Sequence, residues 1–126
     1  MSARTPLGRA RGLGSAKTGT GHWWAQRVTA LALVPLIIWF VVSMIIVTGA
    51  DHEAAKAFIG SPINAVLLIL LIIATFHHGQ LGLQVVIEDY IHTKWLEVAL
   101  ILSVKGAAIF LGVASVYAVF AIALGG

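Results

Sequence analysis

The sequence predicts an all-α membrane protein with three transmembrane helices, an N-terminus in the cytoplasm and a C-terminus on the opposite side. Hydrophobic residues make up 60% of the 126 residues and charged residues only 10%, whereas a soluble domain carries about 25% charged residues. The mean hydropathy is +0.98. Each transmembrane helix needs about 20 residues, so a chain of this length has room for three spans and for no separate soluble catalytic domain.

Cysteine is absent from the chain, which excludes thiolate metal sites, iron–sulfur ligation, disulfide bonds and cysteine nucleophiles within it. Residues 1–27 contain five basic residues and no acidic residue. A basic stretch can bind nucleic acid, but directly before an apolar run it is the positive-inside signal of a membrane protein. We therefore expect membrane lipid, and no nucleic acid, as a partner of this segment.

The N-terminal residues 1–22 are rich in Gly, Arg, Ser and Thr and are expected to form a flexible basic cytoplasmic tail. They lack the apolar segment of a secretory signal. An organelle transit peptide would need an amphipathic helix, which the glycines oppose. We therefore expect a multi-pass protein of the bacterial inner membrane, with the mitochondrial inner membrane as the less favoured alternative, and a three-helix anchor over residues 23–126.

The first span is expected at about residues 28–47. Trp23 and Trp24 precede it, and paired Trp at the edge of an apolar run is typical of the membrane interface. Pro35 should kink the helix, which neighbouring helices can tolerate. Arg27 lies at the entrance of the span, where it either extends to lipid phosphates or faces inward toward an acidic ligand.

A polar connection over residues 48–62 separates the first two spans. A short helix within it is expected to stop at Gly60 and Ser61, and Pro62 suits the first turn of the next helix. The second span is expected at about residues 63–87 and the third at about residues 98–124.

Orientation follows from the distribution of basic residues. Residues 1–27 and the 88–97 loop lie on the same side of a three-helix protein and together carry six basic residues, whereas the opposite side carries only Lys56. Because basic residues concentrate on the cytoplasmic side, the N-terminus is expected there.

Two adjacent histidines, His77 and His78, interrupt the second apolar run. His78 lies about 22 Å along the helix from residue 63 and about 14 Å from residue 87. A neutral imidazole at this depth can coordinate a metal, and haem iron accepts such a ligand. The alternative is a pair of core histidines that are hydrogen-bonded to neighbouring helices.

The two histidines cannot both bind one iron, because adjacent residues on a helix point about 100° apart. The other histidines of the chain, His22, His52 and His92, are expected near the membrane surfaces. If His78 binds a six-coordinate haem, the second axial ligand must therefore come from another chain.

Four further residues near this helix carry chemistry or leave room for it. Gly82, one turn beyond His78, either leaves space for a flat macrocycle or lets helices pack closely. Asp89 and Tyr90 suit a proton-coupled quinone at the membrane edge, since a phenol can donate to a carbonyl; alternatively they are a polar helix end and an interface tyrosine. Lys105 either extends to the inner surface or neutralises a buried acid such as a propionate.

The pattern His78-x3-Gly82-x6-Asp89-Tyr90, preceded by Gln26-Arg27-x-Thr29-Ala30, resembles the small hydrophobic membrane anchor of succinate dehydrogenase, the bacterial respiratory complex II. The resemblance covers nearly the whole chain. The spacing from histidine to the Asp-Tyr pair is quite specific, whereas the Arg-x-Thr-Ala segment alone would be weak.

The resemblance implies a fold, a cofactor and partners. It implies that a second membrane anchor subunit, of the cytochrome b type, shares one haem b with this chain, that His78 is the haem axial ligand, and that Tyr90 and Asp89 bind ubiquinone. Arg27 matches a basic residue near the propionates and the quinone. A flavoprotein subunit and an iron–sulfur subunit would dock on the cytoplasmic face, and electrons from succinate would pass through them to ubiquinone. An alignment shifted by one residue would select His77 as the ligand instead.

Two other functions remain open from the residues alone. The first is a small transporter or assembly component whose buried histidines relay protons or bind a metal. The second is a purely structural anchor without a cofactor. A visible absorption spectrum of the assembled complex distinguishes them from an electron-transfer anchor.

Overall fold

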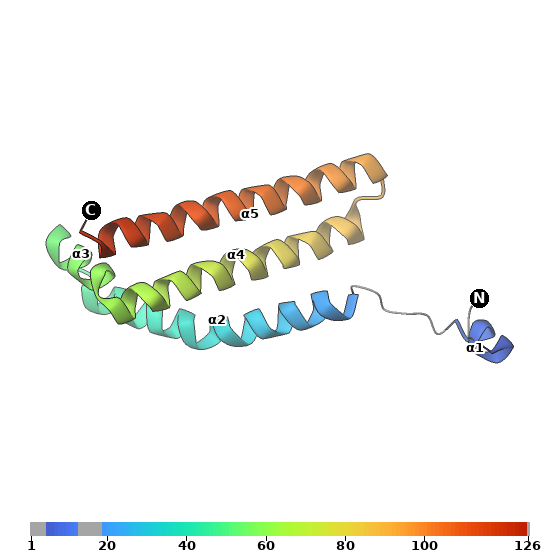
Figure 1. Cartoon of the computed structure of the whole chain (residues 1–126), viewed down its shortest axis with the longest axis horizontal. Helices are drawn as coiled ribbons and strands as arrows, with labels where there is room; N and C mark the ends of the chain where they lie inside the picture. Colours follow the sequence, from blue (N-terminus) through green and yellow to red (C-terminus); the bar gives the residue numbers. More distant parts are fainter. Residues whose placement is uncertain (1–4, 13–18, 126) are drawn as a thin grey trace.

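The computed structural model describes residues 5–12 and 19–125, and these residues form helices joined by short connections. The helices are α1 (Pro6–Ala10), α2 (Gly19–Val47), α3 (His52–Gly60), α4 (Pro62–Tyr90) and α5 (Lys94–Ala123) (Figure 1). The flexible tail expected over residues 1–22 falls partly on residues 1–4 and 13–18, which lie outside the described residues.

Three of these helices, α2, α4 and α5, are long and apolar enough to cross a membrane, with 29, 29 and 30 residues. This confirms the all-α prediction with three transmembrane helices. Each helix begins before the apolar span expected from the sequence. The extension at the start of α2 includes Trp23 and Trp24, because a helix continues into the interfacial layer where such side chains reside.

Helix α4 lies in the middle of the bundle and contacts both α2 and α5. The start of α2, the end of α4 and the start of α5 lie at one end of the bundle, which we term the Tyr90 end (Figure 1). The C-terminus and α3 lie at the opposite end, termed the α3 end. Which end faces the cytoplasm remains a prediction from the basic residues.

The short helix α3 forms where the polar connection was expected to contain one. The Asp51 carboxylate caps its N-terminus by accepting a hydrogen bond from the Ala54 backbone N–H at 2.8 Å. Pro62 occupies the first turn of α4, as expected, because its missing N–H has no intrahelical partner there. The Asn64 side chain donates to the Phe58 carbonyl at 3.0 Å and so ties α4 to α3.

The core lies near the α3 end, where Ala65, Leu68 and Val119 are buried and Trp39 and Phe40 pack against them. Most other large apolar side chains are exposed along the long helices, including Ile46 at 76% and Phe110 at 73%. Such surfaces are incompatible with water but suit lipid or a second apolar protein. The bundle is therefore held by a small core and completed by its surroundings.

Candidate functional site

His78 lies near the middle of α4 and faces α2. Its Nδ1 atom is 3.0 Å from the Oγ1 atom of Thr29, and both residues are half-buried. The same Oγ1 lies 2.7 Å from the Ala25 carbonyl oxygen and 3.1 Å from the Gln26 carbonyl oxygen. The contact joins two residues 49 positions apart in the chain, and it fixes the register of α2 against α4 at this depth.

The face of α2 that meets α4 is polar at its start. Gln26 lies one turn and His22 two turns before Thr29, and the His22 Nε2 and Gln26 Oε1 atoms are buried without a hydrogen-bond partner among the described residues. Gly82 belongs to this contact, because a Cβ placed on it would lie 3.6 Å from Gln26 Nε2. At that distance an added methyl group would be in ordinary van der Waals contact, so α2 lies beside Gly82 without requiring a glycine there.

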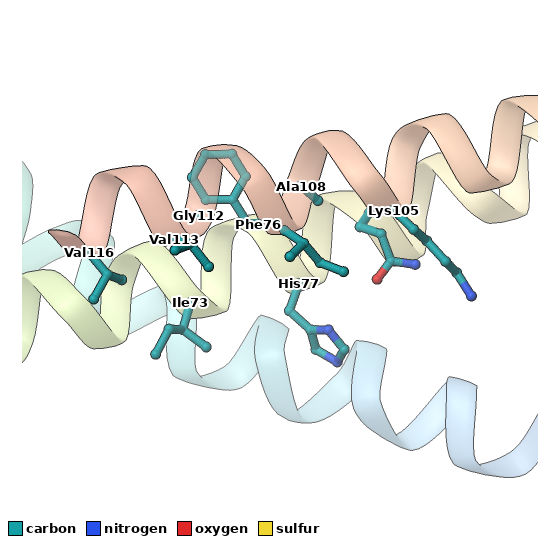
Figure 2. A pocket seen from close by; sticks show the side chains of 10 residues that line it. Ile73, Phe76, His77, Lys105, Ala108, Gly112, Val113 and Val116 are labelled. Atoms are coloured by element: carbon teal, nitrogen blue, oxygen red, sulfur yellow. The ribbon is translucent and has the colours of Figure 1, made fainter.

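His77 lies in different surroundings from its neighbour. It is exposed and lines a cavity of about 530 Å³ between α4 and α5, here termed the α4/α5 cavity. Gln80 and Lys105 are its other polar lining residues, and the rest of the lining is apolar (Figure 2). The structure thus separates the two histidines, with Lys105 on the side of His77.

A row of hydrogen bonds follows α4 from this cavity toward the Tyr90 end. Gln80 donates to the Gln84 side-chain oxygen at 3.3 Å, and Gln84 donates to a Glu88 carboxylate oxygen at 2.9 Å. Gln80 and Gln84 are polar residues within an otherwise apolar span, and their connection to Glu88 was not anticipated. The four-residue spacing of Gln80, Gln84 and Glu88 could have indicated this connection, because side chains four residues apart are neighbours on a helix.

Asp89 and Tyr90 form the last turn of α4 and are both exposed, Tyr90 at 76%. Arg27 is also exposed, near the start of α2, with its guanidinium 5.3 Å from the centre of the Trp23 ring. The Tyr90 end therefore presents a carboxylate, a phenol and a guanidinium on two neighbouring helices. No ion pair joins Arg27 to an acid within the part of the chain that the structure describes.

The donor groups around His78 decide which kind of metal site it fits. Among the described residues there is no group of three or more histidine or carboxylate side chains that could hold a metal ion. A porphyrin supplies four nitrogen ligands itself, so a haem iron needs one side chain from this chain and one from elsewhere. A single half-buried imidazole near the middle of a membrane helix fits that requirement.

Comparisons with known proteins agree on one family. Residues 1–122 match the family model described as succinate dehydrogenase/fumarate reductase transmembrane subunit. The succinate dehydrogenase hydrophobic membrane anchor subunit of Rickettsia bellii is 38% identical over 93% of this chain and 94% of its own length. The corresponding subunit of Paracoccus denitrificans is 36% identical over 96% of this chain and 93% of its own length. The succinate dehydrogenase membrane anchor subunit of Reclinomonas americana is 27% identical over 74% of this chain and 80% of its own length.

Proposed function

The chain belongs to the family of succinate dehydrogenase and fumarate reductase transmembrane subunits, and we propose that it shares one haem b with a second anchor subunit. We also propose that it contributes to a ubiquinone-reduction site. The flavoprotein and iron–sulfur subunits of the complex would dock at the Tyr90 end, on the cytoplasmic side of a bacterial inner membrane. The chain then takes no part in succinate oxidation itself and serves the quinone half of the reaction.

The observation that carries the haem assignment is the placement of His78. Its imidazole is half-buried near the middle of α4, at a contact with α2. His77, the alternative ligand, is exposed in the α4/α5 cavity on another side of the same helix. We therefore assign the axial ligand to His78. A bound haem b supplies a one-electron carrier, and the second axial ligand would come from the partner subunit.

The quinone assignment is supported by the exposed polar groups at the Tyr90 end. A ubiquinone takes up two electrons and two protons when it is reduced to ubiquinol. The Tyr90 phenol can donate a hydrogen bond to a quinone carbonyl. This hydrogen bond would stabilise the negative charge that develops on the carbonyl oxygen during reduction. Asp89, its neighbour, provides a carboxyl group that can pass protons from the aqueous side. Arg27 provides a fixed positive charge near the propionates or the quinone.

Two alanine variants in the assembled complex test the haem assignment. We expect His78→Ala to abolish the α-band of the reduced haem, because the iron loses a ligand, and His77→Ala to retain it. A complex that keeps its haem band in His78→Ala and loses it in His77→Ala would contradict the assignment. His52→Ala is the control for a general effect of removing a histidine, because His52 is exposed at the start of α3, at the opposite end.

A further inference from the structure

Thr29 stands out among the residues around His78, because it touches the proposed ligand without being able to bind the iron. We propose that Thr29 is a positioning residue, which holds the His78 ring in the tautomer that bears hydrogen on Nδ1 and so leaves Nε2 to bind iron. The inference rests on the proposed haem function. It adds which of the two His78 nitrogens binds the iron and which contact keeps that nitrogen free to do so.

The hydroxyl of Thr29 has three polar neighbours but only one hydrogen. Its Oγ1 atom lies 2.7 Å from the Ala25 carbonyl oxygen, 3.1 Å from the Gln26 carbonyl oxygen and 3.0 Å from His78 Nδ1. The carbonyl oxygens can only accept, and the Ala25 contact is the shortest of the three. The hydroxyl therefore donates to its own helix, and its lone pair is left to accept from His78.

The consequence for His78 follows from the two nitrogens of a neutral imidazole. One nitrogen carries the hydrogen and the other carries the lone pair. If Nδ1–H donates to Thr29, the lone pair must be on Nε2, which is the form that can bind a metal. With the opposite tautomer, Nε2 would carry the hydrogen and could not coordinate iron.

Threonine is well suited to this role by its position within a helix. Its branched side chain has few rotamers there, and its hydroxyl can bond to the carbonyl one turn earlier. The hydrogen bond to the Ala25 carbonyl thus fixes the position of the Thr29 Oγ1 atom independently of His78. A hydrogen bond from the outer N–H of a metal-binding histidine orients the ring and raises its basicity, and its loss typically costs about 10- to 100-fold in metal affinity.

The test compares three variants in the intact, purified complex. Thr29→Val keeps the shape of the side chain and removes the hydroxyl, and Thr29→Ser keeps the hydroxyl. Thr48→Val is the matched control, because the Thr48 hydroxyl also bonds to a carbonyl four residues earlier, that of Met44, but lies beyond the end of α2. The readouts are haem dissociation and the haem midpoint potential, neither of which depends on turnover.

We expect Thr29→Val to weaken haem retention by about 10- to 100-fold. We also expect it to raise the midpoint potential, because a less basic imidazole stabilises ferric iron less. Thr29→Ser should stay close to the wild type, and Thr48→Val should match it. Thr29→Ala is measured in the same way should the valine variant fail to assemble.

Several outcomes would overturn the inference, and they can be told apart from failure of the proposed function. Haem retention and potential that are unchanged in Thr29→Val, or equally altered in Thr29→Ser, show that the hydroxyl does not position the ligand. If haem binding depends on His78 but is indifferent to Thr29, only this inference fails. A wild-type complex without haem, or one that keeps haem in His78→Ala, overturns the proposed function as well.

Discussion

Two histidines that are adjacent in the sequence differ sharply in their surroundings. His78 contacts α2 through Thr29, whereas His77 faces the α4/α5 cavity with Gln80 and Lys105. The rotation of about 100° per residue is enough to place His78 against α2 and His77 at an exposed cavity. The sequence predicted that only one could bind a given iron, and the contact with Thr29 gives the physical reason to choose His78.

The contact between Thr29 and His78 itself could not be read from the sequence. Both residues were visible as polar groups near apolar spans, but their pairing depends on how far α2 is displaced along α4. That displacement depends on how the two helices pack along their whole contact, for example where Gln26 lies beside Gly82. The family resemblance drew attention to the segment containing Thr29 but assigned that residue no partner.

Tyr90 provides a test of the quinone assignment at the level of a single oxygen atom. Tyr90→Phe removes the phenol hydroxyl and keeps the ring. We expect succinate-dependent quinone reduction to fall by about tenfold or more, since one hydrogen bond to a charge-developing oxygen is worth roughly 10²–10³ in rate where it has been measured. The haem spectrum should not change. The measurement is steady-state quinone reduction alongside a reduced-minus-oxidised spectrum.

Tyr117→Phe is the matched control, because Tyr117 is the second of the two tyrosines in the chain, is also exposed, and lies in α5 near the α3 end. Equal loss of quinone reduction and of haem in Tyr90→Phe would show that Tyr90 is structural. An effect of the same size in Tyr117→Phe would show that tyrosine hydroxyls support the bundle generally.

At the level of the helices, the boundaries that local chemistry determines were predicted well. Pro62 begins α4, and Gly60 and Ser61 end α3, because a helix stop followed by proline at a first turn is a strong local signal. The extension of α2 back to Gly19 was not expected, since glycines weaken isolated helices. A long helix that is already nucleated can continue through them.

Helix α4 serves two faces of the molecule, and this explains why the polar residues cluster on it. Toward α2 it presents His78, and at the exposed edge of the α4/α5 cavity it presents His77, with the row from Gln80 through Gln84 to Glu88 nearby. As the central helix it can satisfy polar groups on either side. On an outer helix, the same polar groups would face the hydrocarbon of the lipid and would cost energy.

The cap of α3 gives a prediction for one element. Asp51→Ala removes the carboxylate that accepts from the Ala54 N–H and should destabilise the first turn by about 1 kcal/mol. Amide hydrogen exchange at the start of α3 should then be about fivefold faster. Asp51→Asn is the control, since an asparagine oxygen caps nearly as well. Unchanged exchange in Asp51→Ala would show that packing alone holds this turn.

For the molecule as a whole, the exposed apolar side chains show that the long helices require apolar surroundings, which lipid or another membrane protein can supply. The buried core is small and lies near the α3 end, whereas large side chains such as Leu31 and Phe110 are exposed at 73%. Composition predicted the membrane environment, because it follows from the number of apolar residues. It could not predict which exposed faces meet lipid and which meet a partner.

The orientation of the bundle can be tested with introduced cysteines, because the chain has none of its own. Thr93→Cys places a thiol in the exposed connection at the Tyr90 end, and His52→Cys places one at the α3 end. With the basic residues inside, a membrane-impermeant maleimide should label His52→Cys in intact spheroplasts and Thr93→Cys only in inverted vesicles. The reverse labelling pattern would place the N-terminus outside.

The central claim is that His78 supplies one axial bond to a haem whose other axial bond belongs to another chain. Near-infrared magnetic circular dichroism of the oxidised complex tests it most directly, because the position of the low-spin charge-transfer band identifies both axial ligands. The family resemblance implies that the partner also supplies a histidine, so we predict a band typical of two imidazoles in the wild type, and one typical of an imidazole with a thioether in His78→Met. An unchanged two-imidazole band in His78→Met would contradict the claim.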